Sequence, residues 1–260
     1  MNTRRNFMRG LSGLGAIVAT GHAPAIVKSM IAARGTMLGG AHAWTNPYIT
    51  DGLIAMWDGE FPGGVGGKTA QTASEWVDFI KGYVYGRGTN IIYDPTNKCF
   101  VLDKIAQSDA NRFTFDAIPA SGGFTVEIVC AGTWAYTNGM SLIRTNGQNT
   151  IFVYPSYVQI RPAGSSADVS GIGLNTPFYY ANAFTTGNNN NKLYYNGEYK
   201  TAGGTPSGLD PLTYIQAPAQ SLSNRVSGNI YAVRVYSRPL SADEIAANYA
   251  VDKERFNLPS

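Results

Sequence analysis

The stretch at residues 228–250, GNIYAVRVYSRPLSADEIAANYA, joins a strand pattern directly to the start of a helix. Residues 230–236 are rich in β-branched and aromatic side chains, which predicts a strand. The sequence SADE at 241–244 has the spacing of a capping box, in which a Ser hydroxyl and a Glu carboxylate each accept the other residue's backbone N–H. We therefore predict one short helix over 242–249, with Ile245 and Tyr249 packed on the strands.

Upstream of this stretch, short strand-like runs are separated by turns rich in Gly, Asn and Pro. Asn196-Gly197 lies between two such runs and favours the positive φ angles of a type I′ hairpin turn. No regular alternation of strands with helices is present, so a doubly wound α/β fold is excluded. The runs expected as strands are 53–57, 76–80, 83–85, 99–102, 112–115, 124–130, 141–144, 150–154, 157–161, 178–184, 192–195, 212–215 and 230–236.

Six pieces of the chain follow the order found in laminin-G-like, concanavalin A-like domains of the lectin and glucanase superfamily, which residues 50–252 resemble. The pieces are GLIAMWD (52–58), WVD (76–78), FTVE (124–127), SLIR (141–144), KLYYNG (192–197) and the stretch 228–250. The resemblance implies an all-β fold: a two-sheet antiparallel jelly-roll sandwich of about 12 to 14 strands with one short C-terminal helix. It places the domain at 49–256 and a tail at 257–260. The superfamily contains lectins, adhesion modules, polysaccharide hydrolases and phage and surface proteins, so the fold does not specify a function.

Residues 1–25, MNTRRNFMRGLSGLGAIVATGHAPA, resemble a twin-arginine export signal. Arg4 and Arg5 precede a weakly apolar stretch, and the triplet APA at 23–25 fits a cleavage site for a signal peptide. This predicts an exported protein, in the periplasm, on the cell surface or outside the cell, with a linker at 26–48. The alternative is an uncleaved arm, residues 1–48, that holds a structural subunit in a virion or surface fibre.

A membrane span is not expected, because a span needs about 20 apolar residues. Residues 11–33 are interrupted by His22, Pro24 and Lys28.

Charge patterning argues against a nucleic-acid partner. The net charge is +3, but three of the twenty basic residues lie within the first 25 positions, and the other seventeen equal the seventeen acidic residues in number. The body of the chain is therefore formally neutral and has no basic cluster of the kind that binds nucleic acid.

The two cysteines, Cys99 and Cys130, lie in apolar strand-like runs. Their spacing has no metal-site signature. An exported protein could join them in a disulfide. The alternative that we favour is a pair of buried thiols that act as small hydrophobes.

Catalytic motifs are lacking. Hydrolases of the superfamily carry an E-x-D-x-x-E run, which puts paired carboxylates on one face of a strand. Here Glu127 stands alone on its strand, and Asp58 and Glu60 fit a strand end better than a catalytic dyad. His22 and His42 both precede the predicted domain, which excludes a Ser-His-Asp triad or a histidine metal site inside it. We therefore predict a non-enzymatic protein, with a polysaccharide hydrolase as the weaker alternative.

Two turns carry sugar-binding chemistry: aromatic faces that stack on C–H groups, and amides that form hydrogen bonds. The first contains Trp134, Tyr136 and Asn138, and the second contains Tyr154 and Tyr157. These five residues are the predicted glycan-binding site, although aromatics beside turns also cap cores. No metal ligand set and no cofactor are predicted, and calcium binding is left open because no dense acidic loop is present.

These observations predict a carbohydrate-binding or adhesion module that is secreted or displayed on a surface. Its expected partner is a glycan or glycoconjugate. The alternative reading, a structural subunit of a phage or surface fibre, would add a surface or virion protein as a partner.

Overall fold

The structure of the protein is a computed structural model. It describes residues 46–60, 75–78, 80, 84–86, 91–105, 113–118, 123–134, 140–145, 150–153, 157–161, 167–170, 177–185, 192–202, 212–215 and 226–259. The chain divides into two compact units, Met1–His42 and Ala43–Ser260, and every described residue belongs to the second. The predicted export signal at 1–25 and nearly all of the predicted linker lie outside the described residues.

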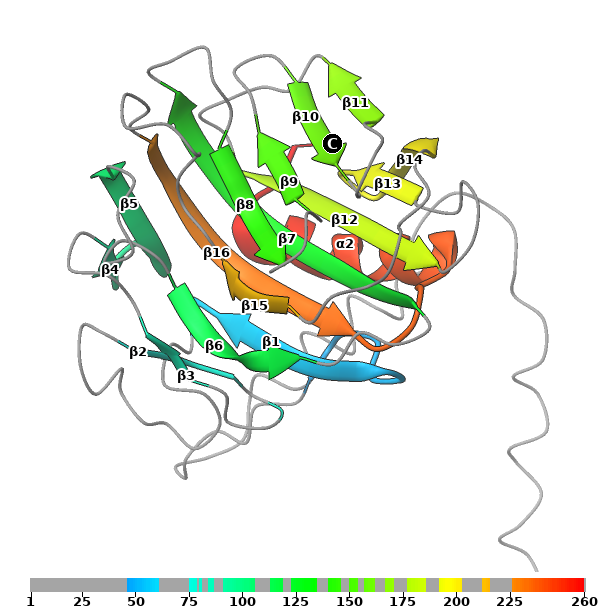
Figure 1. Ribbon diagram of the computed structural model, residues 1–260, viewed down its shortest axis with the longest axis horizontal. Coiled ribbons are helices and arrows are strands. Elements are labelled where there is room, and N and C mark those ends of the chain that lie inside the picture. The colour runs from blue at the N-terminus through cyan, green and yellow to red at the C-terminus, as the bar shows by residue number, and fades with distance from the viewer. Residues whose placement is uncertain are drawn as a thin grey trace, which may run out of the picture. The chain divides into compact units, whose positions relative to one another are not determined.

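Two antiparallel sheets form the second unit, as the sandwich prediction required (Figure 1). Sheet A has the order β14-β13-β12-β7-β16-β5-β4, with β1 also paired to β16. Its strands are β1 (Leu53–Asp58), β4 (Ile91–Asp94), β5 (Cys99–Ile105), β7 (Gly123–Trp134), β12 (Phe178–Thr185), β13 (Lys192–Tyr195), β14 (Glu198–Ala202) and β16 (Val226–Tyr236).

Sheet B has the order β11-β10-β9-β8-β15-β6-β3-β2. Its strands are β2 (Glu75–Val77), β3 (Val84–Gly86), β6 (Phe113–Ile118), β8 (Met140–Thr145), β9 (Thr150–Val153), β10 (Tyr157–Arg161), β11 (Ala167–Ser170) and β15 (Leu212–Ile215).

The sandwich interior follows from period-two alternation along the strands. In β7, Phe124, Val126 and Ile128 are buried on one face, while Thr125 and Glu127 are buried on the other. Both faces of sheet A are therefore covered. On the interior side the two sheets meet through aromatic rings, because Trp76 of β2 lies 4.5 Å from Phe100 of β5 between ring centroids.

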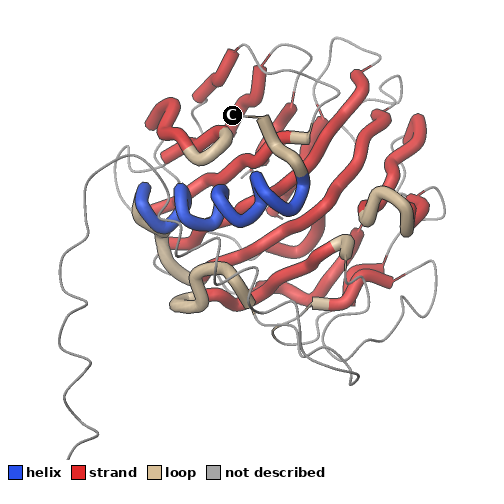
Figure 2. Tube along the Cα trace, turned by 180° about the vertical axis from the view of Figure 1, so that it is seen from behind, coloured by secondary structure: helices blue, strands red, loops and turns tan. Residues whose placement is uncertain are grey.

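The helix α2 (Ala242–Phe256) lies across the face of sheet A that points away from sheet B (Figure 2). The capping box is confirmed: the Glu244 N–H donates to the Ser241 hydroxyl, and the Glu244 carboxylate accepts from the Ser241 N–H. The helix ends at Asn257, in the left-handed conformation. The predicted end near Tyr249 was wrong by about two turns, since the last turns of the helix bury polar rather than apolar residues.

The predicted hairpin turn at Asn196-Gly197 is confirmed, with φ angles of 49° and 77°. It also contacts the helix. A Cβ at Gly197 would come within 2.5 Å of the Tyr249 ring, so both the backbone angle and the space require glycine there. Tyr249 in turn packs on Tyr179 of β12, with ring centroids 5.5 Å apart, and Ile245 is completely buried. Both predicted helix contacts are confirmed.

The strands differ from the prediction mainly at short elements. The described residues contain sixteen strands rather than 12 to 14. β4 and β11 were not predicted, since four-residue segments such as ADVS give too short a pattern to recognise.

Cys99 and Cys130 are buried and free. Burial raises the pKa of both thiols, that of Cys99 to about 12, which keeps them protonated at neutral pH.

The contribution of the α2 capping box to the stability of the fold should depend on pH. The Arg238 guanidinium beside Glu244 is the main cause that lowers the pKa of this carboxyl from 4.5 to about 2. A lowered folded-state pKa means stability that is present above pH 4.5 and is lost as the pH falls toward 2. We therefore expect Glu244→Gln to be less stable than the wild type by about 1 kcal/mol at pH 7, with the difference vanishing near pH 2. Thermal unfolding across this range measures it, and a constant difference would contradict it.

Candidate functional site

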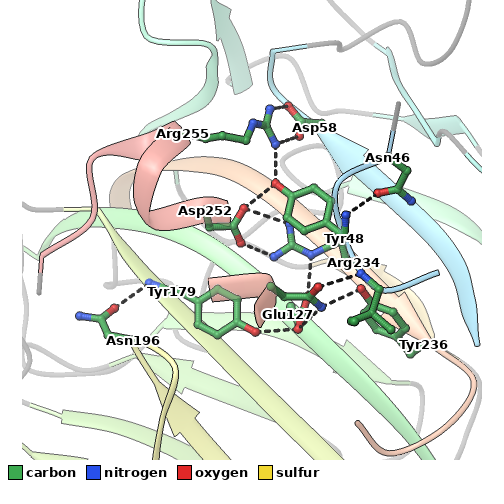
Figure 3. A network of polar contacts seen from close by, with 12 residues as sticks. Asn46, Tyr48, Asp58, Glu127, Tyr179, Asn196, Arg234, Tyr236, Asp252 and Arg255 are labelled. Atoms are coloured by element: carbon green, nitrogen blue, oxygen red, sulfur yellow. Dashed lines mark hydrogen bonds and ion pairs between the residues drawn. The ribbon is translucent and has the colours of Figure 1, made fainter. Parts of the chain in front are cut away.

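A buried polar cluster joins α2 to sheet A (Figure 3). Its centre is Arg234 of β16. The Arg234 Nε donates to Glu127 Oε2 at 2.5 Å, and both terminal nitrogens donate to the carboxylate of Asp252 on α2. All three side chains are completely buried. We call this cluster, with the partners named below, the helix lock.

Tyr48 and Asn248 also belong to the helix lock. Tyr48 donates its hydroxyl to Asp252 at 2.6 Å, and its ring lies under the Arg234 guanidinium, 4.0 Å from the ring centroid. The Asn248 amide donates to Glu127 at 2.9 Å and accepts the Ile49 N–H at 2.9 Å. The chain around residue 48 is thereby fixed to the helix as well as to the sheet.

Tyr179 and Tyr236 also belong to the helix lock. Tyr179 donates its hydroxyl to Glu127 at 2.6 Å, and Asn248 donates to the Tyr236 hydroxyl at 2.9 Å. Both tyrosines are completely buried. Glu127 therefore accepts hydrogen bonds from three different residues, which offsets the cost of burying its charge.

Asp58 and Glu60, the carboxylates weighed as a catalytic dyad, are both held by Arg255 near the end of the helix. The Arg255 guanidinium donates to both oxygens of Asp58, at 2.7 and 3.0 Å, and to Glu60 at 2.9 Å. Lys98 also pairs with Glu60. Burial raises the pKa of Glu60, but the hydrogen bonds from Lys98 and Arg255 outweigh it and the net direction is downward.

Arg234 and Tyr48 of the helix lock stay protonated at neutral pH. Burial alone would lower the pKa of Arg234, but the carboxylates of Asp252 and Glu127 outweigh it and hold the pKa well above its ordinary value. Burial, together with the negative charge of Asp252, raises the pKa of Tyr48, which therefore stays a hydrogen-bond donor. A ligand cannot reach Arg234, Glu127 or Asp252, so their arrangement holds the helix in place and closes this face of sheet A.

The strand register assigns the two faces of sheet B. Trp76 contacts sheet A and is directly opposite Tyr85, so this pair lies on the interior face. Gly86, the next residue along β3, lies on the other face, which we call the outer face of sheet B. From Gly86 one cross-strand row continues on this face through Thr114, Tyr214, Arg144, Thr150 and Arg161.

A second row on the outer face crosses β8 to β11. It consists of Ser141, Phe152, Gln159 and Asp168, and Tyr157 and Ser170 form a third pair beside it. The intervening interior positions are apolar, with Ile143, Ile151, Ile160 and Ala167 in one row. Aromatic, cationic, acidic and amide residues thus share the outer face. Among the described elements, none lies over β8, β9 and β10 on this side (Figure 1).

Of the five predicted glycan-binding residues, the structure describes two, and they lie on different sheets. Trp134 is the last residue of β7 in sheet A, and Tyr157 is the first residue of β10 in sheet B. Tyr136, Asn138 and Tyr154 lie outside the described residues.

Sequence reasoning missed the outer-face residues other than Tyr157. The signal was present in β10, where residues 157–161, YVQIR, alternate polar and apolar types. Such alternation marks a sheet with one buried face and one free face.

No group of three or more His, Cys, Asp or Glu side chains that could hold a metal ion occurs among the described residues. None of the helices found there is long and apolar enough to cross a membrane.

No family model and no curated protein matches the chain. Solved structures do. A Trypanosoma rangeli sialidase in complex with sialic acid matches with a TM-score of 0.58 at 13% identity, over 91% of this chain and 39% of the sialidase. The botulinum neurotoxin type G receptor binding domain matches with a TM-score of 0.54 at 13% identity, over 78% of this chain and 52% of that one.

A third structure concerns botulinum neurotoxin type C, whose cell entry depends upon interaction with two ganglioside molecules. It matches with a TM-score of 0.56 at 12% identity, over 77% of this chain and 51% of that chain. This chain therefore spans about two fifths of the sialidase and about half of the neurotoxin structures. At these identities the similarity shows the fold alone, a β-sandwich compatible with the jelly roll that the sequence resemblance implied.

Proposed function

We propose that this chain is a laminin-G-like, non-enzymatic carbohydrate-binding or adhesion module that is exported and binds glycans on the outer face of sheet B. The observation that carries the proposal is the asymmetry of the sandwich. The helix α2 closes sheet A and fixes it with buried charges, whereas the outer face of sheet B has rows of polar and aromatic residues and no described element over its centre.

The residue types on the outer face suit sugars. Phe152, Tyr157 and Tyr214 supply aromatic rings for stacking, and Gln159 supplies an amide that can donate and accept hydrogen bonds. Strands position such residues more rigidly than loops do, which favours binding.

Two kinds of similar structure are consistent with this reading. One is a sialidase in complex with sialic acid, and the other concerns a neurotoxin that interacts with gangliosides. Binding rather than catalysis is supported by three carboxylates that arginine side chains hold: Asp58 at the end of β1, Glu60 just beyond it, and Glu127 of β7. A carboxylate fixed in this way is poorly suited to donate a proton or to attack a sugar.

An immobilised glycan array tests the proposal with the full chain. We expect retention of at least one class of oligosaccharide. Tyr157→Ala should weaken binding by about tenfold, the loss expected for one aromatic contact. Tyr199→Ala is the control, since this tyrosine is 53% exposed on β14 of sheet A and should keep wild-type binding. Absence of binding to every glycan would contradict the proposal.

The second candidate function is a structural subunit held by residues 1–48. It is favoured by one observation: Tyr48 and Ile49 are hydrogen-bonded to α2, so the end of such an arm would be anchored to the folded unit. The intact mass of the protein from its native source separates the two candidates. Loss of residues 1–25 supports export, whereas Met1 or Asn2 retained in an assembled particle supports the structural subunit.

A further inference from the structure

The described chain enters the folded unit through residues 46–49, Asn-Pro-Tyr-Ile, which we call the strap. The strap belongs to no strand or helix, yet Tyr48 is only 5% exposed. Asn46 shapes it locally, because the Asn46 side-chain oxygen accepts the Tyr48 N–H at 3.0 Å in an Asx turn. The strap thereby holds the Tyr48 ring in one direction, toward α2 and sheet A.

Tyr48 lies between two arginines that come from different elements (Figure 3). Its ring lies under Arg234 of β16, 4.0 Å from the guanidinium carbon to the ring centroid. Its hydroxyl accepts from Arg255 Nη1 at 2.5 Å and donates to Asp252 Oδ1 at 2.6 Å, and both of these partners belong to α2. A cation–π contact and two charge-assisted hydrogen bonds therefore connect the strap to the sheet and to the helix.

The backbone of the strap adds a second connection to the helix. The Ile49 N–H donates to Asn248 Oδ1 of α2 at 2.9 Å. Asn248 and Asp252 are both buried, and each would lose one hydrogen-bond donor if the strap left. Buried polar groups that lose a partner destabilise a fold, so α2 would lose part of its attachment to sheet A.

The same contacts protect the strap from proteases. Proteases cut preferentially where the chain is exposed and its backbone is free of hydrogen bonds. In the strap the N–H groups of Tyr48 and Ile49 are both hydrogen-bonded, and the side chain of Tyr48 is buried. A cut beside Tyr48 therefore requires the helix lock to open first.

We infer that the strap sets the downstream limit of N-terminal processing. An endopeptidase can remove residues 1–45 without loss of stability, whereas a cut between Tyr48 and Asp51 detaches the strap and weakens the hold on α2. Either cut adds water across one peptide bond, leaving a carboxylate on the released segment and an ammonium group on the new N-terminus. Removal of residues 1–25, as the export prediction requires, lies within this limit.

Two full-chain variants test the inference. Each contains the recognition sequence of a site-specific protease flanked by glycines, inserted between Thr45 and Asn46 in one variant and between Thr50 and Asp51 in the other. The uncut sample of each variant is its own control, mass spectrometry verifies the cut, and gel filtration removes any segment that dissociates.

The upstream cut should change the midpoint of thermal unfolding by less than about 1 °C, and the downstream cut should lower it by about 5–10 °C. Hydrogen exchange gives a local measurement of the same effect. Amide protons of α2 should exchange at least about tenfold faster after the downstream cut and at an unchanged rate after the upstream cut.

Variants of Tyr48 connect the effect to the helix lock. Tyr48→Ala should lower the midpoint about as far as the downstream cut does, and a downstream cut made in Tyr48→Ala should then change little, because both remove the same contacts. Tyr48→Phe keeps the ring under Arg234 without the hydroxyl and should have an intermediate midpoint. Thr50→Ala changes an exposed residue beside the strap and is the matched control, with a midpoint like that of the wild type.

Two results would overturn the inference. One is a downstream cut that leaves both the unfolding midpoint and the exchange of α2 unchanged. The other is an upstream cut that lowers the midpoint as far as the downstream cut, which would move the limit to a residue before Asn46. Neither measurement involves a glycan, so the inference and the proposed function can fail independently.

Discussion

Arg234→Met is expected to destabilise the folded unit by about 3–5 kcal/mol, because it leaves the buried carboxylates of Glu127 and Asp252 without their cation. Both carboxylates are completely buried, so water cannot replace the lost guanidinium. A loss of this size is a large fraction of the total stability of a typical domain. Urea denaturation followed by circular dichroism measures it.

Two comparisons make this result specific. Lys98→Met removes a pair with Glu60 whose lysine side chain is 52% exposed, and it should cost less than about 1 kcal/mol. The triple variant Glu127→Gln, Arg234→Met, Asp252→Asn removes all three charges, and it should be more stable than Arg234→Met alone. If Arg234→Met unfolds within 1 kcal/mol of the wild type, the helix lock does not hold α2 on sheet A.

Trp76→Ala is the second large effect, with an expected loss of about 3–5 kcal/mol from the cavity and the lost contacts. Trp76 is completely buried, its ring packs on Phe100 of the other sheet, and its indole N–H donates to the Asp58 carbonyl at 3.1 Å. The side chain therefore connects the two sheets. The midpoint of urea unfolding should shift accordingly.

Trp76→Phe keeps an aromatic ring but removes the indole hydrogen bond to Asp58. It should recover most of the stability that Trp76→Ala loses. The surface control Tyr199→Ala should stay within about 0.5 kcal/mol of the wild type. An equally small effect of Trp76→Ala would contradict the assignment of Trp76 to the sandwich interior. The assignment of the outer face of sheet B would then fail as well, since the register was followed from this residue.

Much of the fold could be predicted because its signals are local. The capping box of Ser241 and Glu244, the Asn196-Gly197 turn and the alternation along β7 each depend on residues that are close in sequence. The full length of α2 could not be predicted. Its last turns bury Asp252 and use Arg255 for ion pairs, and a hydrophobic pattern cannot reveal a helix face whose partners are charges elsewhere in the chain.

The motifs that carried the family resemblance turned out to supply the helix lock and the ion pair beside it. GLIAMWD contains Asp58, FTVE contains Glu127, and the stretch 228–250 contains Arg234 and Asn248. Their spacing along the chain gives no indication that they meet. Glu127 looked like a lone carboxylate because its partners, Arg234 and Asn248, lie 107 and 121 residues away.

The candidate site was harder to predict for a different reason. Aromatic residues beside turns drew attention to Trp134 and Tyr154, whereas Arg144, Gln159 and Arg161 are ordinary strand residues when read singly. Only the cross-strand register brings them to one face. Pairing between β8, β9 and β10 is a long-range property that a single strand pattern does not specify.

Glycan binding at the outer face of sheet B can be tested most directly by protection of an introduced thiol. In the full chain, Gln159→Cys places a cysteine on the outer face, and Val158→Cys places one on the interior face. Background labelling is low because Cys99 and Cys130 are buried. We predict that the cysteine at 159 reacts quickly with a thiol reagent, that the cysteine at 158 is protected, and that a saturating glycan, chosen as a binder from the array, slows the reaction at 159. A cysteine introduced by Tyr199→Cys should be unaffected by the glycan. Rapid labelling at 158 with protection at 159, or a rate at 159 that bound glycan leaves unchanged, would contradict the account.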